Sequence, residues 1–285
     1  NISFDSASSN DDMDLVAGGD IDGGTATAAA ELAIDADGAV DLDSATSDGP
    51  LSIDGSAVTI ANLTGDSITV DSGSEDMTLG TMTASSFIEL TGGVIEFDNA
   101  SGADVDIASA GVISFTSINA TGDVIIEAGA GALSSGIAGG DIESSGAVTI
   151  DASGNVRLDD VTSDGDIGIT ANSSDVTVGT LGSAANIDVE TLGMFSADQV
   201  EASQTGTGQV TISAGNGMAI SDISGNDIVL TAANGLVNVT NNVDVNNILT
   251  ASGGAVYIFT KQDMRVSAER TNGHIRSSSP GHLAW

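Results

Sequence analysis

The chain has 285 residues and a formal net charge of −36, with 41 acidic residues against 5 lysines and arginines. This negative charge argues against nucleic acid and anionic membranes as partners, and no apolar run approaches the roughly 20 residues that span a bilayer. There is no cysteine, so disulfides do not stabilise the fold. With 37 glycines and only 3% aromatic residues, the core is expected to be thin and built from small aliphatic side chains.

A short apolar pattern recurs about every 19 residues along the chain. Each repeat begins apolar-x-apolar-x-x-apolar, continues through a polar loop and ends apolar-x-apolar, as in residues 58–63 with 68–70 and residues 176–181 with 187–189. Alternation of this kind predicts short strands with one face inward. The first strand of each repeat is expected to start at Val40, Val58, Met77, Ile95, Ile113, Val156, Val176, Phe195, Met218, Val237 and Val256.

Strands this short could also form a sandwich or an antiparallel meander. However, no Asn-Gly or Asp-Gly hairpin turn joins them in series. The sequence therefore predicts an all-β fold, a right-handed parallel β-helix (β-solenoid) with coils of about 19 residues, over residues 1–260.

Three stretches interrupt the pattern, at residues 17–31, 127–147 and 201–209. Each is rich in Gly, Ala, Ser or Thr and is predicted to protrude from one coil as a loop. At 127–147 the alternatives are one long coil or strands that exchange roles. Such loops carry binding specificity in many solenoids, although tolerated insertion explains them equally well.

The last 25 residues differ in composition from the rest of the chain. Up to Thr260 the only basic residue is Arg157, whereas residues 261–285 hold four basic residues, both histidines and the only tryptophan. We expect this segment to be a basic cap, a docking segment or a frayed tail. If it docks head-to-tail on the next copy, the residues that carry self-assembly are Lys261, Arg265, Arg270 and Arg276.

Calcium is the one cofactor that the sequence suggests. Asp104, Asp123 and Asp141 are expected to precede the second strand of successive coils, followed by Asp166 and Asp227. Stacked coils would place such carboxylates about 4.8 Å apart, where a cation relieves their repulsion. A second column is expected at Asp35, Asp54 and Asp71. The alternative is that each Asp accepts hydrogen bonds from turn amides.

No catalytic constellation is recognisable, so the chain is not expected to be an enzyme. A polysaccharide lyase would need basic residues, and the repeats offer only Arg157. A glycosidase needs a carboxylate pair at a defined separation and aromatic residues on which the sugar stacks, and aromatic residues are scarce in this chain. An ice-binding face needs a regular Thr-x-Thr array, and the predicted outward column of Asp41, Thr59, Thr78, Glu96 and Ser114 is too mixed.

Three segments, Gly-Asp-Ile-Gly-Ile-Thr-Ala at 165–171, Asn-Asp-Ile-Val-Leu-Thr-Ala-Ala-Asn-Gly at 226–235 and Gly-Asp-Val-Ile-Ile-Glu-Ala-Gly at 122–129, resemble repeats of the filamentous haemagglutinin family. These large bacterial exoproteins use two-partner secretion. The resemblance implies a right-handed β-helix, export across an outer membrane and a role in adhesion or extracellular assembly. Autotransporter passenger domains have similar coils.

The leading prediction is a secreted or cell-surface structural protein or adhesin, whose β-solenoid rod stacks end to end into a filament or forms part of a surface stalk. Its expected partner is a second copy, with a cell-surface glycan or protein receptor as a further candidate. The alternative is a carbohydrate-binding or carbohydrate-degrading β-helix protein. Because the chain starts with Asn1 and shows no signal peptide, it is interpreted as a processed product or an excerpt of a longer exported protein.

Overall fold

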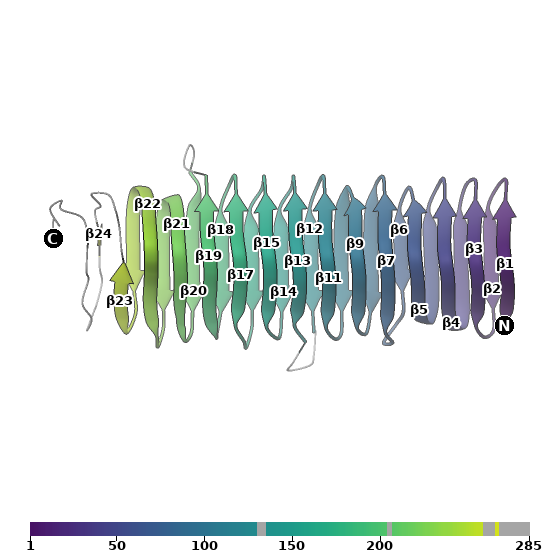
Figure 1. Ribbon diagram of the computed structural model, residues 1–285, viewed down its shortest axis with the longest axis horizontal. Coiled ribbons are helices and arrows are strands. Elements are labelled where there is room, and N and C mark those ends of the chain that lie inside the picture. Colours follow the sequence, from purple (N-terminus) through teal and green to yellow (C-terminus); the bar gives the residue numbers. More distant parts are fainter. Residues whose placement is uncertain (130–134, 204–206, 259–265, 268–285) are drawn as a thin grey trace. The chain divides into compact units, whose positions relative to one another are not determined.

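The computed structural model describes residues 1–129, 135–203, 207–258 and 266–267. Within them all regular structure is β-strand, arranged as a parallel β-solenoid of about 13 turns with coils of about 19 residues. The predicted fold class is therefore confirmed. The chain divides into two compact units, Asn1–Gly140 and Asp141–Trp285, and in each unit the strands lie side by side (Figure 1).

The strands of the first unit are β1 (Ile2–Ser9), β2 (Met13–Ala17), β3 (Ile21–Ala28), β4 (Leu32–Ser47), β5 (Leu51–Gly65), β6 (Ile68–Asp71), β7 (Met77–Ala84), β8 (Phe87–Gly92), β9 (Ile95–Gly102), β10 (Asp104–Ser109), β11 (Ile113–Ala120) and β12 (Val124–Ala128). β13 (Ile137–Ser144) crosses the boundary. The second unit contains β14 (Val148–Ala152), β15 (Val156–Ser163), β16 (Ile167–Ala171), β17 (Val176–Ser183), β18 (Ile187–Thr191), β19 (Met194–Ala202), β20 (Gln209–Ala214), β21 (Gly217–Ala232), β22 (Leu236–Ser252), β23 (Ala255–Ile258) and β24 (Val266–Ser267).

The repeat period is expressed as strand register. Parallel pairing places each first-strand apolar residue beside its equivalent one coil away, so that buried side chains form continuous columns. In the first unit one such column is Ile2, Ile21, Val40, Val58, Met77, Ile95 and Ile113. In the second it is Val156, Val176, Phe195, Met218, Val237 and Val256. These columns confirm that the predicted positions are equivalent from coil to coil, but Val40 and Val58 lie inside the longer strands β4 and β5 and not at strand starts. Apart from the half-buried Ile2, the residues of both columns belong to the core.

The first strand of each coil bends between two consecutive outward residues. In β15 the exposed Asp159 and Asp160 separate the buried Leu158 and Val161, and a side-chain period of two cannot produce this pattern on one flat face. The strand therefore contributes to two faces. We name the residues before the bend the leading face and those after it the trailing face.

The predicted loop at residues 17–31 is wrong, because β3 occupies most of it in register with β1. The apolar pattern fails there since glycine stands at an inward position. A Cβ on Gly23 would lie 2.6 Å from the ring of Phe4 on the neighbouring coil, so the ring fills the space of the missing side chain. Gly139 in β13 lies against Phe115 in the same way, which places a regular strand inside the predicted loop at 127–147. Residues 130–134 and 204–206, in the second and third predicted loops, lie outside the described residues.

Candidate functional site

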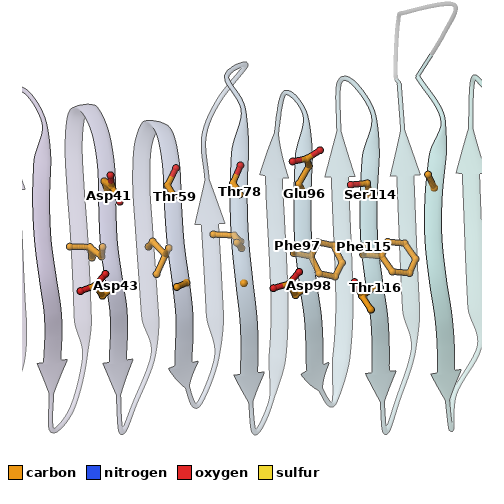
Figure 2. A pocket seen from close by; sticks show the side chains of 16 residues that line it. Asp41, Asp43, Thr59, Thr78, Glu96, Phe97, Asp98, Ser114, Phe115 and Thr116 are labelled. Carbon is orange, nitrogen blue, oxygen red and sulfur yellow. The ribbon is translucent and has the colours of Figure 1, made fainter.

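An open groove of about 730 Å³ crosses the leading face of the first unit (Figure 2). Two outward rows border it, separated by one residue along each strand. The row expected from the sequence consists of Asp41, Thr59, Thr78, Glu96 and Ser114. The second row consists of Asp43, Ala61, Gly80, Asp98 and Thr116. The sequence analysis missed this second row because it considered only the outward residue between the first two apolar residues of each repeat. The two residues between the second and third apolar residues of the pattern apolar-x-apolar-x-x-apolar indicate that a further outward position follows.

Two stacked aromatic rings lie in the floor of the groove. The rings of Phe97 and Phe115 are 5.3 Å apart between centroids and only 11° from parallel, and β9 and β11 place them in register. They are 5% and 8% exposed. Rings covered to this extent stabilise the floor but cannot serve as platforms for a sugar ring.

The groove is acidic. Asp41, Asp43, Glu96 and Asp98 contribute carboxylates, Thr59, Thr78, Ser114 and Thr116 contribute hydroxyls, and no lining residue is basic. These groups can attract cations and accept hydrogen bonds from amines or hydroxyls. The lining residues include no histidine, so within the groove proton transfer near neutral pH would depend on carboxylates alone.

The predicted calcium column is only partly assembled. Asp104 and Asp123 precede register partners Val105 and Val124 on neighbouring coils, and the Oδ1 atom of Asp104 accepts the backbone N–H of Asp123 at 2.9 Å. Asp141, in contrast, lies in the interior of β13, whose exposure pattern is that of a first strand. Asp104 is therefore engaged in the amide contact that was the alternative to calcium binding.

The second predicted column is assembled. Asp35 pairs in register with Asp54, and Asp54 pairs with Asp71. Partial burial raises the pKa of the Asp54 carboxyl above its ordinary value of 3.8, and the carboxylates of Asp71 and Asp35 raise it further. Nevertheless, the described part of the chain contains no group of three or more acidic or histidine side chains arranged to hold a metal ion. Calcium binding stays a prediction.

The four predicted self-assembly residues, Lys261, Arg265, Arg270 and Arg276, lie outside the described residues. The same is true of nearly all of the predicted C-terminal segment 261–285, of which only Val266 and Ser267 are described. The contrast in charge between this segment and the rest of the chain is therefore known from the sequence alone.

In the described residues there is no helix of the length and apolar character needed to cross a membrane. The β-solenoid architecture expected from the resemblance is present, whereas kinship with filamentous haemagglutinins stays a prediction. No family model, no curated protein and no solved structure matches this chain.

Proposed function

We propose that the chain is a secreted or cell-surface structural protein or adhesin, and that it acts by repetitive contact rather than catalysis. The observation that carries this proposal is the register of the outward rows. In the row of Asp41, Thr59, Thr78, Glu96 and Ser114, equivalent positions of successive coils present an acidic or hydroxyl side chain at a spacing of about 4.8 Å. A solenoid offers such extended surfaces instead of a single enclosed cleft.

We further propose that copies associate through opposite charge. The groove is bordered by Asp41, Asp43, Glu96 and Asp98, and a second copy would supply the basic residues Lys261, Arg265, Arg270 and Arg276. Attraction between such surfaces speeds association and weakens with salt. The resulting assembly would be a head-to-tail homopolymer.

The test is sedimentation velocity combined with electron microscopy of the purified full chain at low and high ionic strength. We expect head-to-tail assemblies at low salt that dissociate at high salt. Reversing the four tail charges to Glu should abolish them, and Glu96→Gln with Asp98→Asn should weaken them. Arg157→Glu, a charge reversal in β15, is the matched control and should leave assembly unchanged. A chain that stays monomeric under every condition would refute self-association.

The groove also favours a second candidate, a carbohydrate-binding or carbohydrate-degrading role. Its carboxylates and hydroxyls can accept and donate hydrogen bonds to sugar hydroxyls along an open channel. The burial of Phe97 and Phe115 weakens this candidate. Retention on immobilised polysaccharide that Glu96→Gln abolishes, with or without release of sugar, would establish it over the structural role.

A further inference from the structure

The trailing face of the first unit carries two adjoining columns made only of Ser, Thr and Asn, which we call the hydroxyl face. The columns run across β1, β3, β4, β5, β7, β9 and β11. The first consists of Ser6, Thr25, Ser44, Asn62, Thr81, Asn99 and Ser117. The second, two residues further along each strand, consists of Ser8, Thr27, Thr46, Thr64, Thr83, Ser101 and Asn119.

The hydroxyl face is regular because its strands pair without a register shift at these positions. Neighbours in a column are about 4.8 Å apart, and the two columns are about 6.6 Å apart, so seven coils span about 29 Å. The residue between the columns points inward and is buried, as Leu63, Met82 and Ile118 show with exposures of 1%, 0% and 1%. This buried row holds the outward side chains on a rigid base.

The side chains themselves are also restrained. Threonine is branched at Cβ and has few χ1 rotamers on a strand, so its hydroxyl and methyl groups keep fixed directions. Within the first column the Oγ atom of Ser117 donates a hydrogen bond to Oδ1 of Asn99 at 2.7 Å. Preorganised groups lose little entropy when they bind.

Charge indicates what kind of partner such a face can hold. The chain has a net charge of −36, yet neither column contains a charged side chain. In the second unit the corresponding columns are interrupted by acids, namely Asp160, Glu201, Asp222 and Asp244. A neutral, repetitive surface within an acidic protein matches a neutral, repetitive partner, since a charge would have to give up its hydration on contact.

The partner is further narrowed by what the hydroxyl face is made of. None of its residues is aromatic, so it offers no stacking platform for sugars, and the acidic groove is lined by other residues. A shallow lattice of hydroxyl, amide and methyl groups can hydrogen-bond and order a layer of water.

We propose that the hydroxyl face binds the surface of ice. Its hydroxyl and amide groups would hydrogen-bond to water molecules of the crystal at repeated positions, while the threonine methyl groups pack between them. Each contact is weak, but contacts in one register act together across seven coils. The mixed row from Asp41 to Ser114 argues against ice binding only on the leading face. The proposal is independent of the structural role and of self-association.

The test is thermal hysteresis, crystal shaping and inhibition of ice recrystallisation by the purified full chain. We expect a measurable hysteresis gap and faceted crystals. In the double variant Thr64→Glu, Thr81→Glu the gap should fall several-fold, because the added carboxylates break both columns. The matched control is Thr149→Glu, Thr177→Glu, which makes the same changes at exposed threonines of β14 and β17, outside both the hydroxyl face and the groove, and should keep wild-type ice-binding activity. Circular dichroism and melting establish that both variants are folded.

Two results would overturn the proposal. One is a folded wild-type chain that neither shapes ice nor slows recrystallisation, and the other is an equal loss in both double variants. If the wild-type chain binds an insoluble polysaccharide and not ice, and only the trailing-face variant loses that binding, the face is a glycan site and the assignment to ice is wrong.

Discussion

Oδ1 of Asp104 accepts a hydrogen bond from the backbone N–H of Asp123, the residue in the same place one coil further along, at 2.9 Å. The same contact joins Asp175 to the N–H of Met194 at 2.7 Å and Asp227 to that of Ile248 at 3.2 Å. In each case the Asp directly precedes a buried apolar residue, Val105, Val176 or Ile228, and its side-chain oxygen accepts an amide hydrogen bond from the next coil. This position therefore favours Asp or Asn, whose short side chains place an acceptor within reach of the backbone.

This contact predicts that the acceptor at Asp104 matters more than its charge. Asp104→Asn keeps an oxygen in place and should change the free energy of unfolding by less than about 0.5 kcal/mol. Asp104→Ala removes the acceptor and should cost about 0.5–1.5 kcal/mol. Urea unfolding measures both, and hydrogen exchange at the Asp123 amide should accelerate only in the Ala variant. Asp106→Ala in the same strand is the control and should not destabilise; equal losses at both positions would contradict the assignment.

The sequence predicted the coil and its register because aliphatic residues at inward positions recur with a constant period. It failed at β3 and β13, where Gly23 and Gly139 take inward positions and a ring from the neighbouring coil fills the space. Such a pairing across coils cannot be recognised from one repeat alone. The column of Asp35, Asp54 and Asp71 was predictable, since all three follow the same apolar pair, whereas Asp141 was misplaced with the unrecognised strand β13.

The repeat pattern also explains why the leading-face row was predicted from the sequence and the trailing face was not. The first outward column, from Asp41 to Ser114, follows directly from apolar-x-apolar. The trailing face lies beyond the bend, where the alternation of inward and outward residues changes phase. Uncharged residues such as Thr64 and Thr81 can therefore be assigned to one face only when the register of β5 and β7 is known.

The raised pKa of Asp54 predicts a pH dependence of stability. Because this pKa is higher in the folded state, the contribution of Asp54 favours folding fully below pH about 3.8 and is lost as the pH rises through the raised value. Asp54→Asn should therefore stabilise the chain at neutral pH. The gain should not exceed about 0.2–1 kcal/mol, the range for like charges on neighbouring strands, because solvent screens the exposed carboxylate. At pH 4 the gain should be smaller. Melting curves at the two pH values check this. Asp188→Asn, whose register neighbours are Gly168 and Thr211, is the control and should show no such difference.

The packing of Phe115 on Gly139 predicts a position-specific glycine effect. A Cβ at residue 139 would collide with the Phe115 ring, which cannot withdraw easily because it is stacked on Phe97. Gly139→Ala should destabilise by about 1–3 kcal/mol, and Phe115→Leu in the same chain should recover part of that loss. Gly168→Ala is the control, since a Cβ there meets nothing within 4 Å. Denaturant unfolding of the wild type, the two single variants and the double variant at 139 and 115 forms the cycle, and additive losses at the two positions would refute the contact.

The in-register carboxylates predict that cations stabilise the fold by screening. Asp35, Asp54 and Asp71 lie on successive coils, about 4.8 Å apart, and the Debye length shrinks from about 30 Å at 0.01 M salt to about 3 Å at 1 M. The melting temperature should rise with sodium chloride, and calcium at matched ionic strength should act similarly. At low salt the double variant Asp35→Asn, Asp54→Asn should have a higher melting temperature than the control double variant Asp14→Asn, Asp188→Asn. Its melting temperature should also rise less when salt is added. A melting temperature insensitive to sodium, calcium and chelator would contradict screening. An extra calcium response that only the Asp35, Asp54 pair removes would show instead that these carboxylates bind the ion, because screening does not distinguish cations by their coordination.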